Sequence, residues 1–498
     1  MKTKRITSLL LCIAMLLSLA ACAGDEAEEK ETTAAQTDAV ETEIETEPNP
    51  YDPGLPDRDF GGIDFIIAVR GNETEYEWDV KDVEVDNITG DPVNDAIYDR
   101  TVFLEEKYNV DIDALCCGDV GESGTWKIVS DAVMTNDTSF QAILNSLGET
   151  SEFALEDFLV DLKKVENLNL SQPWWDQNAN KELQLAGNLY FTASEMTTVD
   201  NDAVLVLLFD KSIVEQYNLD NPYEDVLNGT WTMDKMMSNS AAVTTDLDGN
   251  GKMNEDDRFG FLYWQDAYMP LLHGMGNTIG ELGEDGLPVL TFYNEHMFDS
   301  WAKLNAYITS GTTLARKNEL DIFKSDQGQS IDYMLAKNNV LYIYACVVDI
   351  IILRENDTDF GVLPYPKFDE AQQRYFSTIS GWGASVLSIP ITNTNLADTG
   401  FPLEAYCAKS AELLTPAYYD VQLTRKGIRD EDSAAMLDII FSTVKYDIGD
   451  IFDWGSVCSI LVNNFNSKKA EIASPLSKYT TKAETALQET LDKLLAED

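Results

Sequence analysis

The stretch from Thr244 to Phe261, TTDLDGNGKMNEDDRFGF, spaces oxygen-bearing side chains in the pattern of a cation-binding loop. The spacing follows the EF-hand loop D-x-[DN]-x-[DN]-G-x5-E, in which oxygen atoms surround a calcium ion. Gly251 stands where that loop turns sharply and needs a residue that tolerates a positive φ. The predicted ligands are Asp246, Asp248, Asn250, the backbone carbonyl of Lys252, Asn254 and Asp257.

Hard oxygen ligands favour calcium over zinc or copper at this loop. Its last position carries Asp257 instead of the usual Glu, and because Asp is shorter we expect weaker binding than in a calcium sensor. The chain offers one such loop without a paired second loop, which favours a structural role over a switch. The alternative is an Asx-rich turn that holds no ion.

Residues that could support catalysis are sparse. The chain has two histidines, His273 and His296, and lacks the H-E-x-x-H, G-x-S-x-G, P-loop and G-x-G-x-x-G motifs. A glycosidase needs only two suitably spaced carboxylates, and an acidic chain has many. We therefore predict that the protein is not an enzyme, with a surface carbohydrate-active enzyme as an open alternative.

The first residues predict a targeting segment. Lys2, Lys4 and Arg5 precede an apolar run (residues 6–20) that is short for a membrane-spanning helix and typical of a signal peptide. The run ends in Leu-Ala-Ala-Cys, which resembles a bacterial lipobox. We predict a lipoprotein signal peptide at 1–21 and a diacylated Cys22, which would hold the protein on the outer face of a membrane. The alternative is an ordinary signal peptide with a chance cysteine.

Residues 22–57 are rich in Glu, Thr and Ala and close with prolines. Such a composition cannot bury enough apolar surface to fold, and its like charges extend the chain, so we predict a disordered acidic tether. The net charge of the whole chain is −52. This charge argues against nucleic acid and anionic lipid headgroups as partners. Membrane contact is therefore expected through the N-terminal lipid only.

The chain from about Arg58 onward exceeds one typical domain and suggests two lobes. Residues 61–72 form an apolar strand that ends in a polar turn. Residues 93–115 begin as a helix capped by Asn94 and continue as a strand, and residues 139–148 and 187–194 predict further strands. Strands alternating with helices indicate an α/β fold.

Several segments, taken in order, resemble one family. They are AVLVLLFDKSIVEQYNLDNPYEDVLNGTWTMDKM (203–236), DYMLAKNNVLYIY (332–344), DFGVLPYPKFD (359–369) and GWGASVLSIP (381–390), with ANKELQLAGNLYFTASE (179–195) before them. Their order resembles that of extracellular solute-binding proteins of ABC importers, the family-1 type that includes maltose-binding protein. The lipobox and acidic tether are similar to those of Gram-positive members. Lys337-Asn338-Asn339 replaces a glycine that is usual in the family.

The resemblance implies a periplasmic-binding-protein-like type II α/β fold, with two lobes, a crossover hinge and a ligand cleft between the lobes. The predicted lobes are 58–190 plus 366–415, and 192–364 plus 416–498. The second lobe contains the predicted calcium loop, 246–257. A ligand that contacts both lobes would shift the protein toward a closed state.

Ligands of this family are largely carbohydrates, which are bound by flat aromatic rings and by polar side chains. The resemblance and the strand ends place the predicted ligand contacts after the first strand, at the end of strand 139–148, at the crossovers and in the second lobe. These residues are Arg70, Asn72, Asn145, Ser146, Glu195, Asp200, Trp264, Asp266, Trp382 and Trp454.

The sequence therefore predicts a lipid-anchored solute-binding protein on the extracellular face of the cell membrane. We expect it to be a monomer that captures a sugar or oligosaccharide and delivers it to the permease subunits of an ABC importer. The other alternative to this function is a calcium-dependent adhesin or cell-wall module.

Overall fold

The computed structural model describes residues 49–71, 77–121, 124–315, 329–353, 358–428 and 430–495. Pro50–Asp498 forms one compact unit, to which the following description applies. The predicted signal peptide, Cys22 and most of the predicted tether lie outside the described residues, as does Asn72. Within the described ranges, no helix combines the length and apolar character needed to cross a membrane.

Five strands form the first sheet, in the order β2-β1-β3-β13-β4. Strand β1 lies parallel to β2 and β3, whereas β13 lies antiparallel to β3 and β4. Because β13 is far from the others in sequence, the chain leaves this sheet and later returns to it. The strands are β1 (Ile63–Val69), β2 (Val110–Cys116), β3 (Ala142–Ser146), β4 (Phe191–Thr192) and β13 (Ser385–Ser388).

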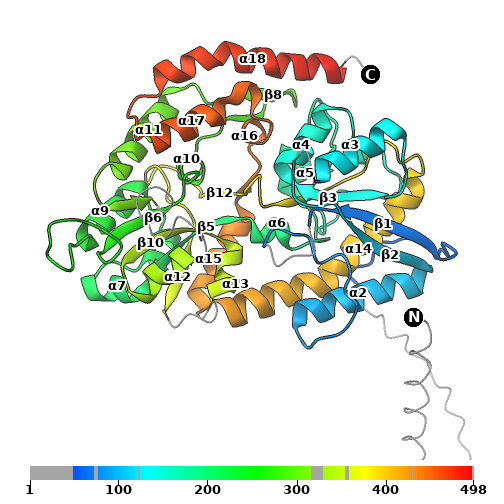
Figure 1. Ribbon diagram of the computed structural model, residues 1–498, viewed down its shortest axis with the longest axis horizontal. Coiled ribbons are helices and arrows are strands. Elements are labelled where there is room, and N and C mark those ends of the chain that lie inside the picture. The colour runs from blue at the N-terminus through cyan, green and yellow to red at the C-terminus, as the bar shows by residue number, and fades with distance from the viewer. Residues whose placement is uncertain are drawn as a thin grey trace, which may run out of the picture. The chain divides into compact units, whose positions relative to one another are not determined.

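Alternate side chains of β1 enter different cores, because successive side chains of a strand point to opposite faces. Phe65 and Ile67 pack in the core that also contains residues of α2 and α14, and Ala68 packs with residues of α3 and α4. Figure 1 shows α3 and α4 on one face of the sheet and α2 and α14 on the other. The bounds are α2 (Pro92–Tyr108), α3 (Thr125–Thr135), α4 (Leu147–Leu155), η1 (Leu162–Lys164), α5 (Gln177–Glu182) and α14 (Leu396–Pro416).

Helix α2 begins at a different cap from the one predicted. The carboxylate of Asp91 accepts the backbone N–H groups of Val93 and Asn94 at 3.1 and 3.2 Å. Pro92 occupies the start of the helix, where its fixed φ and missing N–H cost nothing. Asn94 therefore lies inside the first turn, and the prediction that it caps the helix was wrong.

A second sheet of five strands has the order β11-β5-β10-β6-β9. Strand β10 lies antiparallel to β5 and parallel to β6, so the centre of this sheet is mixed. Strand β11 pairs antiparallel with β5, and β9 pairs parallel with β6. The strands are β5 (Leu205–Asp210), β6 (Phe259–Tyr263), β9 (Thr313–Ala315), β10 (Val340–Cys346) and β11 (Phe360–Leu363).

Local signals set the starts of the helices around the second sheet. Asp210, Asn221 and Thr232 each accept a backbone N–H in the first turn of α7, α8 and α9. The helices are α6 (Val199–Asp202), α7 (Lys211–Tyr217), α8 (Pro222–Leu227), α9 (Met233–Val243), α10 (Tyr268–Gly274), α11 (Glu295–Ile308), α12 (Gln329–Ala336), α13 (Val347–Ile352), α15 (Glu431–Ser442), α16 (Ile448–Phe452) and α17 (Val457–Asn466).

Short elements join the two sheets. Strand β12 (Ser377–Thr378) pairs parallel with β14 (Val444–Lys445), and β7 (Gly280–Leu282) pairs antiparallel with β8 (Pro288–Leu290). A π-helix, η4 (Ala417–Gly427), continues α14 and contacts both α2 and α13. The chain passes between the sheets after β4, after β11 and after α14. These passages fall near the ends of the predicted lobe ranges, which stay a prediction.

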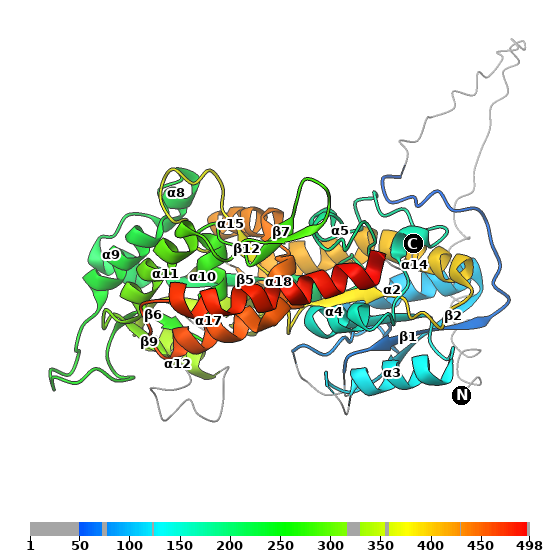
Figure 2. The same ribbon diagram turned by 90° about the horizontal axis from the view of Figure 1, so that it is seen from above.

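The C-terminal helix α18 (Ala473–Leu495) packs against α17 and against the short helix η5 (Trp454–Ser456). Figure 2 shows α18 running alongside α17 and on toward α4. Near its end, the Lys493 ammonium forms an ion pair of 2.7 Å with Asp157, which follows α4. The last helix of the chain thus contacts elements associated with both sheets.

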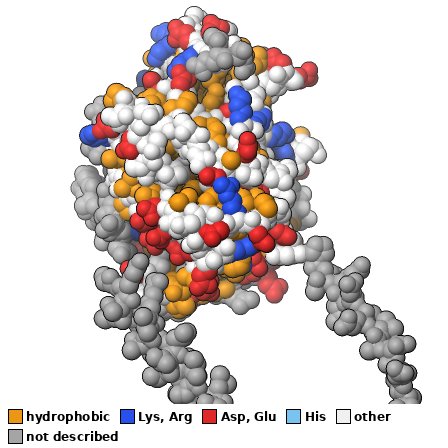
Figure 3. Space-filling view, turned by 90° about the vertical axis from the view of Figure 1, so that its right-hand side faces the viewer, with side chains coloured by type: hydrophobic (Ala, Val, Ile, Leu, Met, Phe, Trp, Pro, Cys, Tyr) orange, Lys and Arg blue, Asp and Glu red, His pale blue; other side chains and the backbone are white. Residues whose placement is uncertain are grey.

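Charged side chains of both signs share the surface. On the face drawn in Figure 3, Asp and Glu side chains are interspersed with Lys and Arg side chains. Several exposed aspartates pair with lysines, such as Asp220 with Lys235 and Asp234 with Lys303. Such exposed pairs contribute little to stability. Figure 3 shows no continuous basic patch on the face that it draws.

Candidate functional site

Arg70 and Trp382 come together where β1 ends and the chain returns toward β13. The Arg70 guanidinium donates through Nε to Asp119 Oδ1 at 2.9 Å and lies 5.0 Å from the centre of the Trp382 ring. It also donates through Nη1 to the Trp382 carbonyl. Arg70 is 1% exposed, whereas Trp382 is 54% exposed. The structure therefore presents an open indole ring on top of a buried cation.

Asn145 and Ser146 lie beside this pair, at the end of β3. Asn145 donates through Nδ2 to Glu149 Oε2 at 2.8 Å, and Glu149 Oε1 accepts the backbone N–H of Gly121 at 2.6 Å. Burial raises the pKa of Glu149, although these two bonds and the nearby Arg70 oppose the shift. Ser146 caps α4 by accepting the Glu149 N–H. Arg70, Asp119, Asn145, Glu149 and Trp382 are called the Arg70 group below.

One buried polar atom of the Arg70 group, Asn145 Oδ1, has no hydrogen-bond partner among the described residues. Asn145 is fully buried, and no atom of the described residues donates a hydrogen bond to its Oδ1. Buried polar atoms are nearly always paired with protein or ordered water. Asn145 Oδ1 can therefore accept a hydrogen bond from a ligand hydroxyl or a water molecule.

Trp264 and Asp266 follow β6 in the other sheet. Trp264 is partly buried against the core of that sheet, and Asp266 is exposed. Burial raises the pKa of Tyr344 at the adjoining strand β10, and the Asp266 carboxylate raises it further. Nearby Tyr365 is fully buried, and its hydroxyl has no hydrogen-bond partner among the described residues. This region thus offers a second set of aromatic and acidic groups.

Glu195 and Asp200 lie in the passage from the first sheet to the second, among other acids. Glu195 accepts a hydrogen bond from Thr415, the residue just before the end of α14. Asp200 is buried, and burial raises its pKa well above the usual range, with further increases from Glu195, Asp176 and Asp82. The sequence predicted that Glu195 and Asp200 contact the ligand. The structure places them in a buried acidic cluster at the crossover.

Trp454 lies away from the Arg70 group. Its ring stacks on Phe452 at 5.3 Å, its Nε1 donates to Thr490 Oγ1 at 3.0 Å, and it is 3% exposed. Helix α18 supplies Thr490 and covers the indole. A cavity of about 330 Å³ lies beside it, between α18 and the end of α4. Trp454 is among the residues that line this cavity.

Trp78 was missed by the sequence analysis. It is partly buried and packs against all three apolar cores, so it lies where residues of both sheets meet. A Cβ on Gly383 would come within 2.8 Å of its ring, which explains why a glycine follows Trp382. Trp78 belongs to no strand or helix, so neither periodicity nor a strand end could have identified it.

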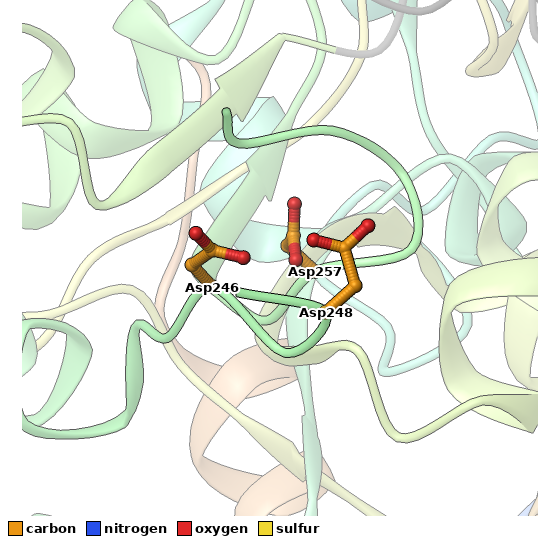
Figure 4. A group of neighbouring side chains, drawn as sticks. All are labelled: Asp246, Asp248 and Asp257. Carbon is orange, nitrogen blue, oxygen red and sulfur yellow. The ribbon is translucent and has the colours of Figure 1, made fainter. Parts of the chain in front are cut away.

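The predicted calcium loop brings three carboxylates together. One oxygen from each of Asp246, Asp248 and Asp257 lies within 4.8 Å of the others, and Figure 4 shows the three groups turned toward a common space. Asp246 accepts the backbone N–H groups of Gly249 and Gly251, both at 2.7 Å, which wraps the loop around it. The Gly251 bond contributes most to lowering the pKa of Asp246.

The rest of the loop supports the same arrangement. Asp257 is fully buried, and its two oxygens accept the N–H groups of Leu247 and Asn254, both at 2.8 Å. Among the described residues, none of the three clustered aspartates forms an ion pair. Their like charges repel one another, and a divalent cation would add positive charge to that supplied by the backbone N–H groups. These oxygen donors fit calcium.

The end of the loop is tied to the second sheet. Thr245 and Arg258 exchange backbone hydrogen bonds of 3.0 Å, which close the base of the loop directly before β6. Arg258 Nε donates to the Asn338 carbonyl, and Asn339 Nδ2 donates to the Glu255 carbonyl, both at 2.9 Å. The Lys337-Asn338-Asn339 departure from the family pattern thus supplies contacts to the loop.

His273 forms a buried polar chain that resembles a catalytic triad only in its residue types. Its Nε2 lies 3.0 Å from Asp447 Oδ2 and its Nδ1 lies 2.8 Å from Thr378 Oγ1. Asp447 also accepts the N–H groups of Ile279 and Gly280. Thr378 is 3% exposed, so its hydroxyl is not accessible to a substrate. The hydrogen-bonded side chains of Thr378, His273 and Asp447 thus join β12, α10 and the start of α16.

Comparison of the sequence with models of known families and with curated proteins finds no match. Comparison of the structure does find similar solved proteins. The GacH receptor of Streptomyces glaucescens, solved unliganded and with acarbose, is 14% identical with a TM-score of 0.51, over 87% of this chain and 97% of that one.

Two further structures give the same result. The ABC substrate-binding protein Lmo0181 of Listeria monocytogenes, solved with cycloalternan, is 11% identical, with a TM-score of 0.50 over 86% of this chain and 97% of that one. UgpB of Mycobacterium tuberculosis, solved with glycerophosphocholine, is 13% identical, with a TM-score of 0.52 over 87% and 99%. These similarities confirm the predicted periplasmic-binding-protein-like type II fold.

Proposed function

We propose that the protein is an extracellular solute-binding protein that captures a sugar or oligosaccharide and delivers it to an ABC importer. The observation that carries the proposal is the exposed indole of Trp382, which lies beside the buried amide of Asn145. A flat aromatic ring next to hydrogen-bonding groups suits the apolar faces and hydroxyl groups of a sugar. The similar structures solved with acarbose and cycloalternan support the same ligand class.

The similar structure solved with glycerophosphocholine shows that this fold also serves other solutes. In the Arg70 group, the one cation is already paired with Asp119 and accompanied by Glu149. An anionic phosphate would therefore meet carboxylates there without an uncommitted positive charge to balance it. This charge balance favours a neutral sugar over a phosphodiester.

A thermal-shift experiment with chosen ligands tests the proposal. We expect maltotetraose, acarbose or cycloalternan to raise the melting temperature of the wild-type protein, and glycerophosphocholine to leave it unchanged. Trp382→Ala should reduce the ligand-induced shift. Trp126→Phe is the matched control, because the Trp126 ring contacts Phe153 and Phe158, with ring centres 5.2 and 6.0 Å apart, and makes neither of these contacts with the Arg70 group. If no saccharide stabilises the protein, the sugar assignment fails.

Binding without catalysis is the function we propose for this site, because the similar structures are those of binding proteins. A surface carbohydrate-active enzyme is the alternative that product analysis would detect. Incubation with the stabilising saccharide, followed by chromatography, should return the saccharide intact. Shortened or rearranged products would instead support the enzyme.

We also propose the lipid anchor at Cys22 and the location on the outer face of the cell membrane. Both rest on the Leu-Ala-Ala-Cys motif after the apolar run. Metabolic labelling with a radioactive fatty acid should mark the wild-type protein and not Cys22→Ser. Labelled Cys22→Ser protein would contradict the anchor.

Calcium is proposed as a structural ion in the loop 246–257. Asp246, Asp248 and Asp257 would hold it, together with oxygen atoms of Asn250, Lys252 and Asn254. The bound ion would supply positive charge to the three clustered carboxylates. Because Arg258 joins the end of the loop to β6, an ordered loop would hold the start of the segment that leads to Trp264 and Asp266.

A further inference from the structure

Arg70 is fully committed to contacts inside the protein. Its side chain is 1% exposed, and its Nη2 forms an ion pair of 2.8 Å with Asp119, in addition to the bond from Nε. A guanidinium without exposed surface cannot be the group that a ligand meets first. Arg70 therefore has a role other than direct contact with a ligand.

Arg70 contacts Trp382 in two ways. It donates a hydrogen bond to the Trp382 carbonyl, and its guanidinium carbon lies 5.0 Å from the centre of the indole ring. A planar guanidinium can lie against an aromatic ring and attract it electrostatically. The two contacts together fix the backbone of residue 382 and one side of its ring.

Other hydrogen bonds hold the backbone on either side of Trp382. Gly148 N–H donates to the Gly381 carbonyl and Leu147 N–H to the Ala384 carbonyl, both at 2.8 Å. Glycines on either side of Trp382 provide no side chain to support the indole. The guanidinium of Arg70, by contrast, lies against the indole ring itself.

We propose that Arg70 is a positioning residue that holds the indole of Trp382 in its ligand-binding orientation and does not itself contact the ligand. The inference rests on the proposed function, because it assigns Trp382 to the binding surface. Asp119 holds the guanidinium through the hydrogen bond from Nε and the ion pair with Nη2. Loss of Arg70 leaves the indole attached to a fixed backbone but free to change its side-chain rotamer.

The first test needs no ligand. The protein is labelled with 5-fluorotryptophan, and the ¹⁹F NMR signal of Trp382 is identified by its loss in Trp382→Phe. Arg70→Lys should shift or broaden that signal, because lysine keeps the charge but lacks the planar group that lies against the ring. Asp119→Asn should cause a smaller change in the same signal. It is a second variant at a half-exposed side chain, in case Arg70→Lys does not fold.

Arg100→Lys is the matched control for replacing a buried arginine. Arg100 is fully buried, lies 4.2 Å from the Tyr406 ring and donates to backbone carbonyls, among them that of Val83 at 2.9 Å. It makes none of these contacts with Trp382. Arg100→Lys should therefore leave the Trp382 signal unchanged. An unchanged Trp382 signal in both Arg70→Lys and Asp119→Asn would overturn the proposal.

The second test is a double-mutant cycle with maltotetraose as the probe. Arg70→Lys should weaken binding at least fivefold in the wild-type background and less than twofold in the Trp382→Ala background, because its effect passes through the indole. An equal loss in both backgrounds would show direct contact and overturn the proposal. If maltotetraose does not bind the wild-type protein, the proposed sugar function fails, and the ¹⁹F result alone decides the role of Arg70.

Discussion

At the scale of single residues, buried polar groups in this protein take partners from distant segments. Trp174 and Trp175 are adjacent, yet both are buried and both donate their indole N–H to Glu404 on α14. On an extended segment, successive side chains point in opposite directions, so a segment with one covered face would bury only one of the two. A single carboxylate with two oxygens allows both to be inside.

Glycine 383 gives a prediction at the residue scale. Gly383→Ala should lower the free energy of unfolding by about 1–3 kcal/mol, because its Cβ would overlap the Trp78 ring at 2.8 Å. Gly381→Ala is the matched control, because a Cβ there meets nothing within 4 Å. Urea unfolding of both variants measures the difference. Equal stabilities of the two variants would show that Trp78 does not pack against residue 383.

Asp202 predicts a pH dependence of stability. Burial raises its pKa to about 7, although the Tyr418 hydroxyl donates to it at 2.7 Å and opposes the shift. In the unfolded chain, the pKa of an Asp side chain is about 4. Between these values the folded protein binds more protons than the unfolded chain, so this carboxyl lowers stability as the pH rises from 4 to 7.

Asp202→Asn should therefore flatten the fall in stability between about pH 4 and 7. Chemical unfolding at several pH values measures the free energy of unfolding for the variant and the wild type. Asp299→Asn, at an exposed carboxyl of α11, is the control and should reproduce the wild-type slope. A wild-type slope in Asp202→Asn would mean that its carboxyl does not gain a proton on folding.

At the scale of elements, the predicted calcium loop and β6 form one connected segment. Calcium should raise the melting temperature, and EGTA should reverse the increase. The gain in the free energy of unfolding is roughly 2.7 kcal/mol when calcium is at one hundred times its Kd. Asp248→Asn should reduce the gain, because it removes one of the clustered carboxylates.

The control for the loop is Glu284→Gln, which removes an exposed acid between β7 and β8. It should keep the full response to calcium. A melting temperature that does not respond to calcium or to EGTA would favour the alternative, an Asx-rich turn without an ion. In that case hydrogen bonds such as those from Gly249 and Gly251 to Asp246 hold the loop without an ion.

The contact between α18 and Trp454 gives another prediction for an element. Thr490→Val keeps the shape of the side chain but removes the acceptor of the Trp454 N–H. The stability of the protein should fall by about 1–3 kcal/mol, because a buried donor is left unpaired. Thr485→Val, on an exposed position of the same helix, should have a much smaller effect. Thermal unfolding of both variants provides the measurement.

Local signals account for the elements, whereas contacts between distant segments form the Arg70 group. The segment 203–236 forms β5, α7, α8 and the start of α9, because Asp210, Asn221 and Thr232 act through neighbours a few residues away. In contrast, the partners of Arg70 come from segments after β2 and before β13. A strand end predicts the edge of the sheet at which a residue lies. It does not predict which groups from distant segments surround the side chain.

Trp454 and Trp78 also have contacts with distant segments that sequence patterns do not reveal. The resemblance predicted Trp454 as a ligand contact, and this stays a prediction; the structure adds that its indole N–H donates to Thr490 of α18, far along the chain. Trp78 carries no pattern that the sequence could reveal, yet it packs against all three cores. Both outcomes depend on packing between segments that are distant in sequence.

At the scale of the whole molecule, three passages of chain connect the two sheets. The passage after β4 contains Glu195 and the passage after α14 begins near Thr415, and these two residues are hydrogen-bonded. The π-helix η4 lies in the latter passage, next to α13 and α2. A small number of connecting segments in contact with one another is enough to form a hinge, because only a few residues need to absorb the change in backbone angles.

The last prediction is that ligand binding changes the shape of the protein. If the Arg70 group and the segment that carries Trp264 and Asp266 bind the same sugar, the bound state gains contacts from both sheets, and binding shifts the population toward a closed form. Small-angle X-ray scattering should show a smaller radius of gyration with maltotetraose than without it. Trp382→Ala should show no change at the same concentration, because it lacks one side of the site. An unchanged radius in a wild-type protein that calorimetry shows to be saturated would mean that the ligand is held by one lobe alone.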